Sequence, residues 1–486
     1  MGKLKKLAGD TIIYGASTIV GRLLNWLLMP FYIRTLDPVQ FGGVVNIYSY
    51  IAVVLVILTF GFETGYFRFA KKTNRQDLLS TLGGFVTMLS LFFVLLVYFL
   101  KDSIASLLGN EHLTSEYFFI GALIVSLDAI TSIPFADLRI RNKTMRYATL
   151  KFVSVLLNIV FNVFFLVICP YLYKEGYTPV NYIYDPNNKL LYVFIANLLS
   201  SLIISVFLIP QLFKGHFVVR KELLRAVLRY SYPVMIVGLF GMLIQNIDKI
   251  LMPHLIGENA MEALAIYGAN YKIGVLMALF IQSYRLAFEP FFFKEGKEKA
   301  STELYARILK YFVIFGMIVF VGVLVFIDLI NVLLLPEYYE GNRIIPLILL
   351  GQLFFGIYYS LSLWYKLTDK THFGAIISGI GAVLAIVANL IFVPSMGYMG
   401  AALSSLLCFL LMTIISYFLG QKYYPVNYPV ANIIFHIVSG MAVVVISQLY
   451  TSDNQLFHFG FKGTIFVAYF VFLYFTERKE FNKILS

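Results

Sequence analysis

The sequence predicts an all-α integral membrane protein with about fourteen transmembrane helices. Of the 486 residues, 60% are hydrophobic and 13% are charged, whereas a soluble globular domain carries about 25% charged residues. The apolar runs are continuous over about 18 to 25 residues, the length of a membrane-spanning helix. A transmembrane β-barrel would instead alternate apolar and polar residues over segments of about 10 residues.

The apolar segments predicted to span the membrane are, in order, 11–34, 43–66, 79–100, 117–137, 150–172, 190–212, 232–255, 264–288, 308–330, 344–365, 373–393, 399–420, 431–450 and 462–476. The first follows the basic start MGKLKKLAGD without a small-residue cleavage site. We therefore expect an uncleaved helix rather than a signal peptide. Cys169 and Cys408 fit no zinc or redox spacing, so a packing role is predicted for both.

The basic residues predict the orientation of these helices, because cytoplasmic loops retain Lys and Arg. With the N-terminus inside, the inner segments contain 27 of the 38 Lys and Arg residues and the outer segments contain 5. Both termini are therefore predicted to be cytoplasmic. The net charge of +12 follows mostly from this distribution and from attraction to anionic lipid. Nucleic acid is not expected as a partner, because no soluble basic domain is present.

Two halves of the chain repeat similar residues in the same order. LMP at 28–30 recurs at 251–253, and FG at 41–42 recurs as YG at 267–268. KT at 143–144 recurs at 370–371, and each is followed by an asparagine, Asn162 or Asn389, at the same spacing. The offsets of 223, 226 and 227 residues correspond to six helices. Because six is an even number, the two halves are predicted to run parallel.

The repeat predicts two six-helix lobes, 1–213 and 231–420, related by a pseudo-two-fold axis and joined by a basic cytoplasmic linker at 214–230. Residues 421–486 add two C-terminal helices and a basic tail. Such repeats are typical of secondary transporters, which bind substrate between the lobes and alternate the access to it.

Three stretches resemble a known family. GRLLNWLLMPFYIRTLDPVQFG (21–42) resembles the first helix and outer loop of bacterial polysaccharide exporters. QNIDKILMPHLIG (245–257) and AIYGANYKIG (265–274) are similar to their seventh-helix Asp-basic motif and the start of their eighth helix. These are the Wzx-type O-antigen and capsule flippases of the multidrug/oligosaccharidyl-lipid/polysaccharide (MOP) exporter superfamily, which are related to MurJ and the MATE exporters.

The resemblance implies a two-lobe transporter in the bacterial cytoplasmic (inner) membrane. It would flip an undecaprenyl-pyrophosphate-linked oligosaccharide from the inner to the outer leaflet for lipopolysaccharide or capsule biosynthesis. A polysaccharide polymerase and glycosyltransferases are possible partners, and H⁺ or Na⁺ is a possible coupling ion. Family members often carry arginine where this chain has Lys249, and lysine lacks the bidentate fork that grips phosphate.

Charged residues deep in a membrane usually face a cavity or a partner. The candidate substrate-binding cations are Arg22, Lys249 and Lys272. Arg22 lies near the midplane at a rise of about 1.5 Å per residue, where it either binds pyrophosphate or pairs with Asp128 of the fourth helix. Lys249, in the outer third of the seventh helix, either contacts substrate or extends toward the interface.

Asp128 and Asp248 are the candidates for ion coupling or pairing. Because adjacent helical residues point about 100° apart, Asp248 and Lys249 are not expected to share a partner. The candidate polar lining of the cavity comprises Asn25, Gln245, Asn162 and Asn389, with interhelical hydrogen bonds as the alternative for the last two. The candidate inner gate comprises Arg285, Glu289 and Glu63. The alternatives are a local Arg285–Glu289 pair and an interfacial position for Glu63.

The sequence contains no GxxxxGK[ST] nucleotide loop, HExxH, GxSxG or Cys/His ligand set. We therefore expect no enzymatic activity, cofactor or metal. Two rival functions stay open. A MATE-type cation-coupled drug exporter would favour an acidic cavity, whereas five basic residues lie in the membrane region: Arg22, Lys151, Lys249, Lys272 and Arg285. A membrane glycosyltransferase or polymerase usually needs a large outer loop, and the segment 174–189 is short.

Overall fold

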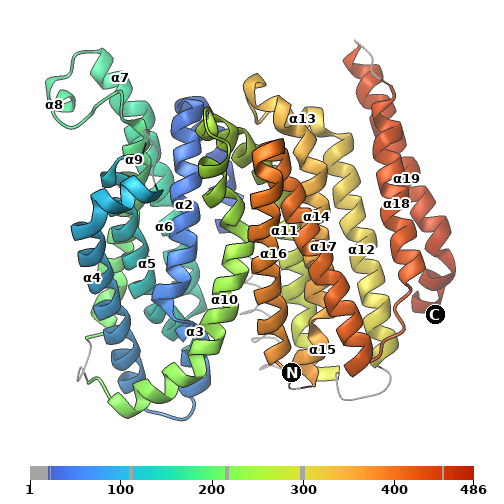
Figure 1. The fold of residues 1–486 in the computed structure, drawn as a ribbon, viewed down its shortest axis with the longest axis horizontal. Helices are drawn as coiled ribbons and strands as arrows, with labels where there is room; N and C mark the ends of the chain where they lie inside the picture. The colour runs from blue at the N-terminus through green and yellow to red at the C-terminus, as the bar shows by residue number, and fades with distance from the viewer. Residues whose placement is uncertain are drawn as a thin grey trace. The chain divides into compact units, whose positions relative to one another are not determined.

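A computed structural model describes residues 20–21, 23–108, 113–213, 218–295, 301–368, 370–450 and 454–485, without the side chains of 286–295, 301, 366–367 and 479–485. In this part of the chain all regular structure is helical, and 13 helices are long and apolar enough to span a membrane (Figure 1). They follow the predicted spans in order from the second to the last. Of the first predicted span, residues 20–21 and 23–34 are described, and they are helical. The all-α membrane fold is therefore confirmed.

The helices, labelled as in Figure 1, are α2 (Pro38–Thr59), α3 (Phe62–Phe69), α4 (Arg75–Leu108), α5 (Ser115–Ile140), α6 (Thr144–Val163), η1 (Phe164–Ile168), α7 (Cys169–Lys174), α8 (Thr178–Asn181), α9 (Lys189–Leu208), η2 (Ile209–Gln211), α10 (Lys221–Leu255), α11 (Ala260–Glu295), α12 (Ser301–Val325), α13 (Ile327–Asn331), η3 (Pro336–Ile344), α14 (Ile345–Leu361), α15 (Leu363–Leu367), α16 (His372–Met396), α17 (Tyr398–Tyr423), α18 (Val430–Gln448) and α19 (Gln455–Leu485).

The chain forms two compact units, Met1–Gly268 with Ala385–Tyr398 and Ala269–Leu384 with Met399–Ser486. In the first unit α5 packs on α4 and α9, and α10 packs on α2 and α3. In the second unit α12 packs on α14, α18 and α19. The lobes 1–213 and 231–420 stay a prediction, and α10 begins inside the segment 214–230 that we predict as a linker.

The second predicted span is interrupted, which we did not expect. A single continuous helix over 43–66 is wrong, because α2 ends at Thr59 and α3 begins at Phe62. Phe60 and Gly61 between them have left-handed φ angles of 53° and 65°. A Cβ atom on Gly61 would lie 3.1 Å from the carbonyl oxygen of Ser231 and from the amide nitrogen of Met235. Glycine therefore permits both the left-handed turn and the close approach of α10.

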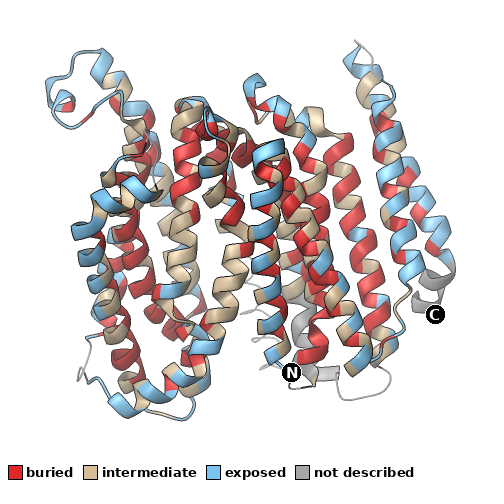
Figure 2. Cartoon of the chain, in the orientation of Figure 1, coloured by how far each residue is buried: buried red, intermediate tan, exposed pale blue. Residues whose placement is uncertain are grey.

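The outward faces of the helices are apolar, as a hydrocarbon solvent requires. In α4, Phe92, Leu95 and Phe99 are exposed, and pale exposed positions follow one side of the helix (Figure 2). The interior of the first unit is also apolar, with Phe62, Leu82 and other side chains packed in one cluster. Polar groups buried in this surrounding therefore identify candidate sites.

Candidate functional site

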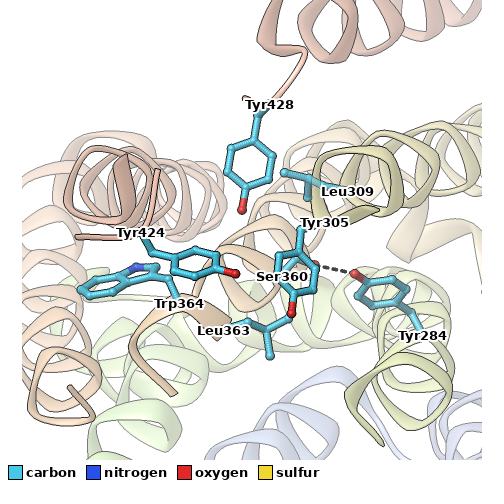
Figure 3. Close-up of a pocket in the computed structure, with 8 residues that line it drawn as sticks. All are labelled: Tyr284, Tyr305, Leu309, Ser360, Leu363, Trp364, Tyr424 and Tyr428. Atoms are coloured by element: carbon cyan, nitrogen blue, oxygen red, sulfur yellow. Dashed lines mark hydrogen bonds between the residues drawn. The ribbon is translucent and has the colours of Figure 1, made fainter. Parts of the chain in front are cut away.

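A small aromatic pocket lies in the second unit (Figure 3). Its lining comprises Tyr284, Tyr305, Leu309, Ser360, Leu363, Trp364, Tyr424 and Tyr428. The Ser360 hydroxyl donates a hydrogen bond to the Tyr284 hydroxyl over 3.1 Å. The cavity volume of about 10 Å³ is the space needed for one water molecule. A sugar ring does not fit in this arrangement, so the pocket is not the candidate site.

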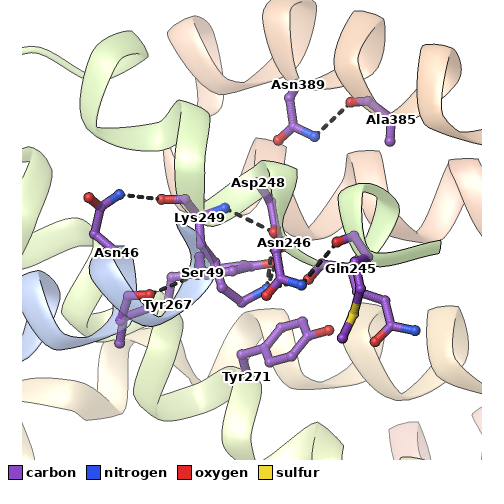
Figure 4. A network of polar contacts seen from close by, with 12 residues as sticks. Asn46, Ser49, Gln245, Asn246, Asp248, Lys249, Tyr267, Tyr271, Ala385 and Asn389 are labelled. Carbon is purple, nitrogen blue, oxygen red and sulfur yellow. Dashed lines mark hydrogen bonds and ion pairs between the residues drawn. The ribbon is translucent and has the colours of Figure 1, made fainter. Parts of the chain in front are cut away.

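The candidate site is a buried charge pair on α10 in the first unit (Figure 4). The Lys249 ammonium donates to both carboxylate oxygens of Asp248, over 3.0 and 3.1 Å, and to the carbonyl oxygen of Gln245 over 2.8 Å. Only 8% of the Lys249 side chain and 2% of the Asp248 side chain are exposed. Lys249 therefore does not extend to the membrane interface in this structure.

Tyr267 of α11 joins both members of this pair. Its hydroxyl donates to the Asp248 carboxylate, and the Lys249 ammonium lies 5.6 Å from the centre of its ring, within cation–π range. Our expectation that Asp248 and Lys249 share no partner is wrong. The long lysine stem folds back along the helix, so the angle between adjacent Cβ atoms does not decide where the charge lies.

A proline in α10 accounts for a further polar contact beside the charge pair. Pro253 has no backbone N–H, so it cannot donate to the carbonyl of Lys249 one turn earlier in the helix. The Asn46 side chain of α2 donates to this carbonyl over 2.9 Å, and Asn46 is fully buried. Asn46 therefore supplies the hydrogen bond that Pro253 removes and joins α2 to α10 beside the charge pair. The sequence analysis missed Asn46.

Two repeat-related glycines lie where α2 meets the start of α11. A Cβ atom on Gly42 would lie 2.1 Å from the carbonyl oxygen of Met261. A Cβ atom on Gly268 would lie 2.6 Å from the Val45 side chain. The FG and YG segments of the repeat thus both serve close helix packing, which larger residues would prevent.

The two halves also make the same local hydrogen bonds. The amide of Lys143 donates to the carbonyl of Leu138 over 2.9 Å, and the amide of Lys370 donates to that of Tyr365 over 2.8 Å. Asn162 and Asn389 each donate a side-chain hydrogen bond to the carbonyl four residues earlier, over 2.8 Å. These bonds are 227 residues apart, so equivalent positions of the two halves make the same local contacts, and the six-helix repeat stays a prediction. In these bonds Asn162 and Asn389 contact their own helices.

The structure places the other predicted acids in separate surroundings. Asp128 on α5 accepts a hydrogen bond from Ser201 of α9 over 2.8 Å, and Lys151 is the cation that acts on it electrostatically. Glu63 pairs with Arg139 at an exposed position, which is the interfacial alternative.

The remaining candidates are only partly described. The Arg285 guanidinium lies 3.8 Å from the centre of the Tyr359 ring, whereas the side chain of Glu289 lies outside the described residues, as does Arg22. Lys272 and Gln245 are half-buried and Asn25 is exposed. These roles stay predictions.

A second buried charge cluster was not predicted. Glu477 of α19 contacts the Lys310 ammonium over 2.6 Å and the His436 imidazole over 3.0 Å. Lys310 lies in α12 and is 3% exposed. The contact joins α18 and α19 to α12. The sequence does contain a signal for this cluster, because all three ionisable residues lie near the ends of predicted spans.

Comparisons with known proteins agree with this architecture. A family described as "Polysaccharide biosynthesis protein" matches residues 7–295, more than half of the chain. No curated protein sequence matches the chain. A structure of the lipid II flippase MurJ in an inward closed conformation is similar over 95% of this chain and 99% of its own, with a TM-score of 0.75 and 16% identity.

Two multidrug transporters have the same fold. An inward-facing MATE family transporter of the MOP superfamily is similar over 85% of this chain and 97% of its own, with a TM-score of 0.66 and 14% identity. The MATE multidrug transporter DinF-BH is similar over 86% and 95%, with a TM-score of 0.62 and 15% identity. At such identities these likenesses establish the fold alone.

Proposed function

Because this chain belongs to the polysaccharide biosynthesis protein family, we propose that it flips an undecaprenyl-pyrophosphate-linked oligosaccharide from the inner to the outer leaflet of the bacterial inner membrane. Family membership is the observation that carries this proposal. The shared fold with MurJ, described as a lipid II flippase, supports a lipid-linked cargo moved by alternating access. The chain acts as a carrier in this proposal, and no catalytic step is assigned to it.

The buried pair of α10 gives the proposal a chemical step. Lys249 pairs with Asp248 in this structure, and a pyrophosphate offers the ammonium a more highly charged partner. In our proposal the pyrophosphate exchanges with Asp248, whose carboxylate keeps hydrogen bonds from Tyr267 and from the Lys249 amide. Such contacts are stronger in the low dielectric of the membrane than in water. Arg22 and Lys272 are the further cations proposed to hold the head group.

Deletion of the gene tests the function. It should abolish surface polysaccharide and leave the lipid-linked precursor on the inner leaflet. Unchanged surface polysaccharide in the deletion strain would contradict a flippase role. Increased sensitivity to cationic drugs with unchanged polysaccharide would favour the MATE-type exporter instead.

Complementation tests the site. The Lys249→Met variant should restore little polysaccharide per amount of folded protein in the membrane. Its matched control removes a surface cation, Arg220→Gln, from the exposed pair with Asp77. This control should restore polysaccharide fully. Equal activity of the two variants would remove Lys249 from the proposed mechanism while leaving the flippase role open.

A further inference from the structure

Charged side chains gather where α3, α4, α5 and α6 end or begin, on the side predicted to be inner. We call them the Asp137 cluster: Tyr66, Arg75, Asp137, Arg141, Lys143 and Arg146. Asp137 is 1% exposed. It accepts hydrogen bonds from the Tyr66 hydroxyl over 2.8 Å and from Arg75 over 2.8 and 2.9 Å. Arg141 approaches it to 3.7 Å. A buried carboxylate therefore orients two arginines.

The charges of the Asp137 cluster do not balance. The cluster contains four cations and one carboxylate, and repulsion from Arg141, with smaller contributions from burial, Arg146 and Arg75, lowers the pKa of Lys143. The nearby acids are engaged elsewhere, since Glu63 pairs with Arg139 and Asp77 pairs with Arg220. The cluster is therefore a place where an added anion gains favourable contacts.

The repeat provides an internal control for this excess of cations. The second half forms the equivalent backbone hydrogen bond, which the Lys370 amide donates to the Tyr365 carbonyl. There, Asp137, Arg141 and Arg146 are replaced by Trp364, Thr368 and Phe373. Both turns are predicted on the inner side. Neither the turn nor the inner location therefore requires the cations of the first half.

We propose that the Asp137 cluster binds the phosphate of a lipid head group in the inner leaflet. The described contacts with Asp137 use only the Nη1 atoms of Arg75 and Arg141. Each guanidinium has five N–H donors, and its planar fork matches phosphate. The cluster lies at the ends of four membrane spans, which is the level of lipid head groups.

Two lipids share this chemistry, an anionic phospholipid and the pyrophosphate carrier of the cargo. If the carrier is the ligand, the Asp137 cluster is where the substrate first docks, and only this form of the inference rests on the proposed function. The test therefore measures binding, not transport.

The experiment uses the purified full chain and native mass spectrometry with added phosphatidylglycerol or undecaprenyl pyrophosphate. The test variant is Arg141→Gln, Lys143→Gln, Arg146→Gln, which keeps Asp137 and its contacts with Tyr66 and Arg75. The matched control removes three exposed cations of α10: Lys221→Gln, Arg225→Gln, Arg229→Gln. Each basic residue near an anionic surface contributes about fivefold in affinity, so the test variant should lose on the order of 100-fold.

The outcomes separate the two lipids. Loss for both lipids in the test variant alone supports a general head-group site, and loss for undecaprenyl pyrophosphate alone supports substrate docking. Equal loss in the test and control variants, or no loss in either, overturns the proposal. Thermal unfolding checks that the test variant is folded. If it is not folded, the single variant Lys143→Gln replaces it and should lose about fivefold in lipid affinity. Binding without transport would count against the proposed function and not against this site.

Discussion

Removal of one member of the α10 charge pair should cost more stability than removal of both. In Lys249→Met, Asp248 stays buried without its cation. Breaking a buried ion pair in this way typically costs about 3–5 kcal/mol. Asp248 keeps hydrogen bonds from the Tyr267 hydroxyl and from the backbone amide of residue 249. We therefore expect the lower end of that range, about 3 kcal/mol.

The double variant Asp248→Asn, Lys249→Met removes both charges. The asparagine oxygen can still accept from the backbone amide, its NH2 group can donate to the Tyr267 hydroxyl, and replacement of a whole buried pair by uncharged residues is often close to neutral. We expect a cost of about 1 kcal/mol or less, so the double variant should be more stable than Lys249→Met alone.

Equilibrium unfolding of the purified protein in mixed micelles with increasing SDS measures these free energies. Asp77→Asn, Arg220→Gln is the matched control, because that pair is exposed on its arginine side and exposed pairs contribute about 0–1 kcal/mol. The single variant Asp248→Asn completes the comparison. If the stability cost of the double variant equals the sum of the costs of Asp248→Asn and Lys249→Met, the pair does not form in the membrane and the reasoning is refuted.

Three further predictions concern packing, backbone satisfaction and pH. Asn46→Leu should cost about 1–3 kcal/mol, the penalty for an unsatisfied buried group, and Pro253→Ala in that background should restore most of it, as the same unfolding assay would show; no recovery would contradict the proposed pairing. Gly42→Ala should cost about 1–3 kcal/mol of stability by overpacking. Gly241→Ala should cost little, because a Cβ atom added at Gly241 would meet nothing within 4 Å in the described part of the chain. The pKa of Asp328 is lowered, because hydrogen bonds and charge from neighbouring cations outweigh the effect of burial. The contribution of Asp328 to the free energy of unfolding is therefore present above the usual carboxyl pKa and is lost as the pH falls below it. The difference in thermal stability between the native protein and Asp328→Asn should accordingly shrink below about pH 4.

Much of the fold could be predicted because a membrane imposes one solution on long apolar segments. Hydropathy located the spans, the polysaccharide-exporter resemblance is confirmed by the match to the polysaccharide biosynthesis protein family, and the likeness to MurJ and a MATE transporter confirms the fold. The break at Phe60 and Gly61 was missed, because the apolar run of α2 continues through both residues and only tertiary packing against α10 decides between a straight helix and a turn. The local contacts at Lys143, Lys370 and the two asparagines coincide with the predicted repeat because they depend on nearby residues of the chain.

The site was less predictable than the fold. Depth in a span indicates that Asp248 and Lys249 need partners, but it does not identify them. Tyr267 was visible only as part of a repeat, and Asn46 is an ordinary polar residue in an apolar helix. A specific signal for Asn46 did exist, since a proline inside a membrane helix predicts an unsatisfied carbonyl one turn earlier. Which helix supplies the donor depends on packing that the sequence does not encode locally.

The proline and the charge pair have a common consequence for α10. Pro253 weakens the helix at the residue that carries the cation, and Asn46 fastens that same carbonyl to α2. A change in the partner of Lys249, from Asp248 to an anionic ligand, therefore acts on a helix segment already held by side chains rather than by its own backbone. Side-chain bonds can be exchanged without breaking the rest of the helical ladder. In the proposed mechanism this arrangement would couple the binding of an anion at Lys249 to bending of α10 at Pro253, and the Asn46→Leu variant with and without Pro253→Ala separates the two.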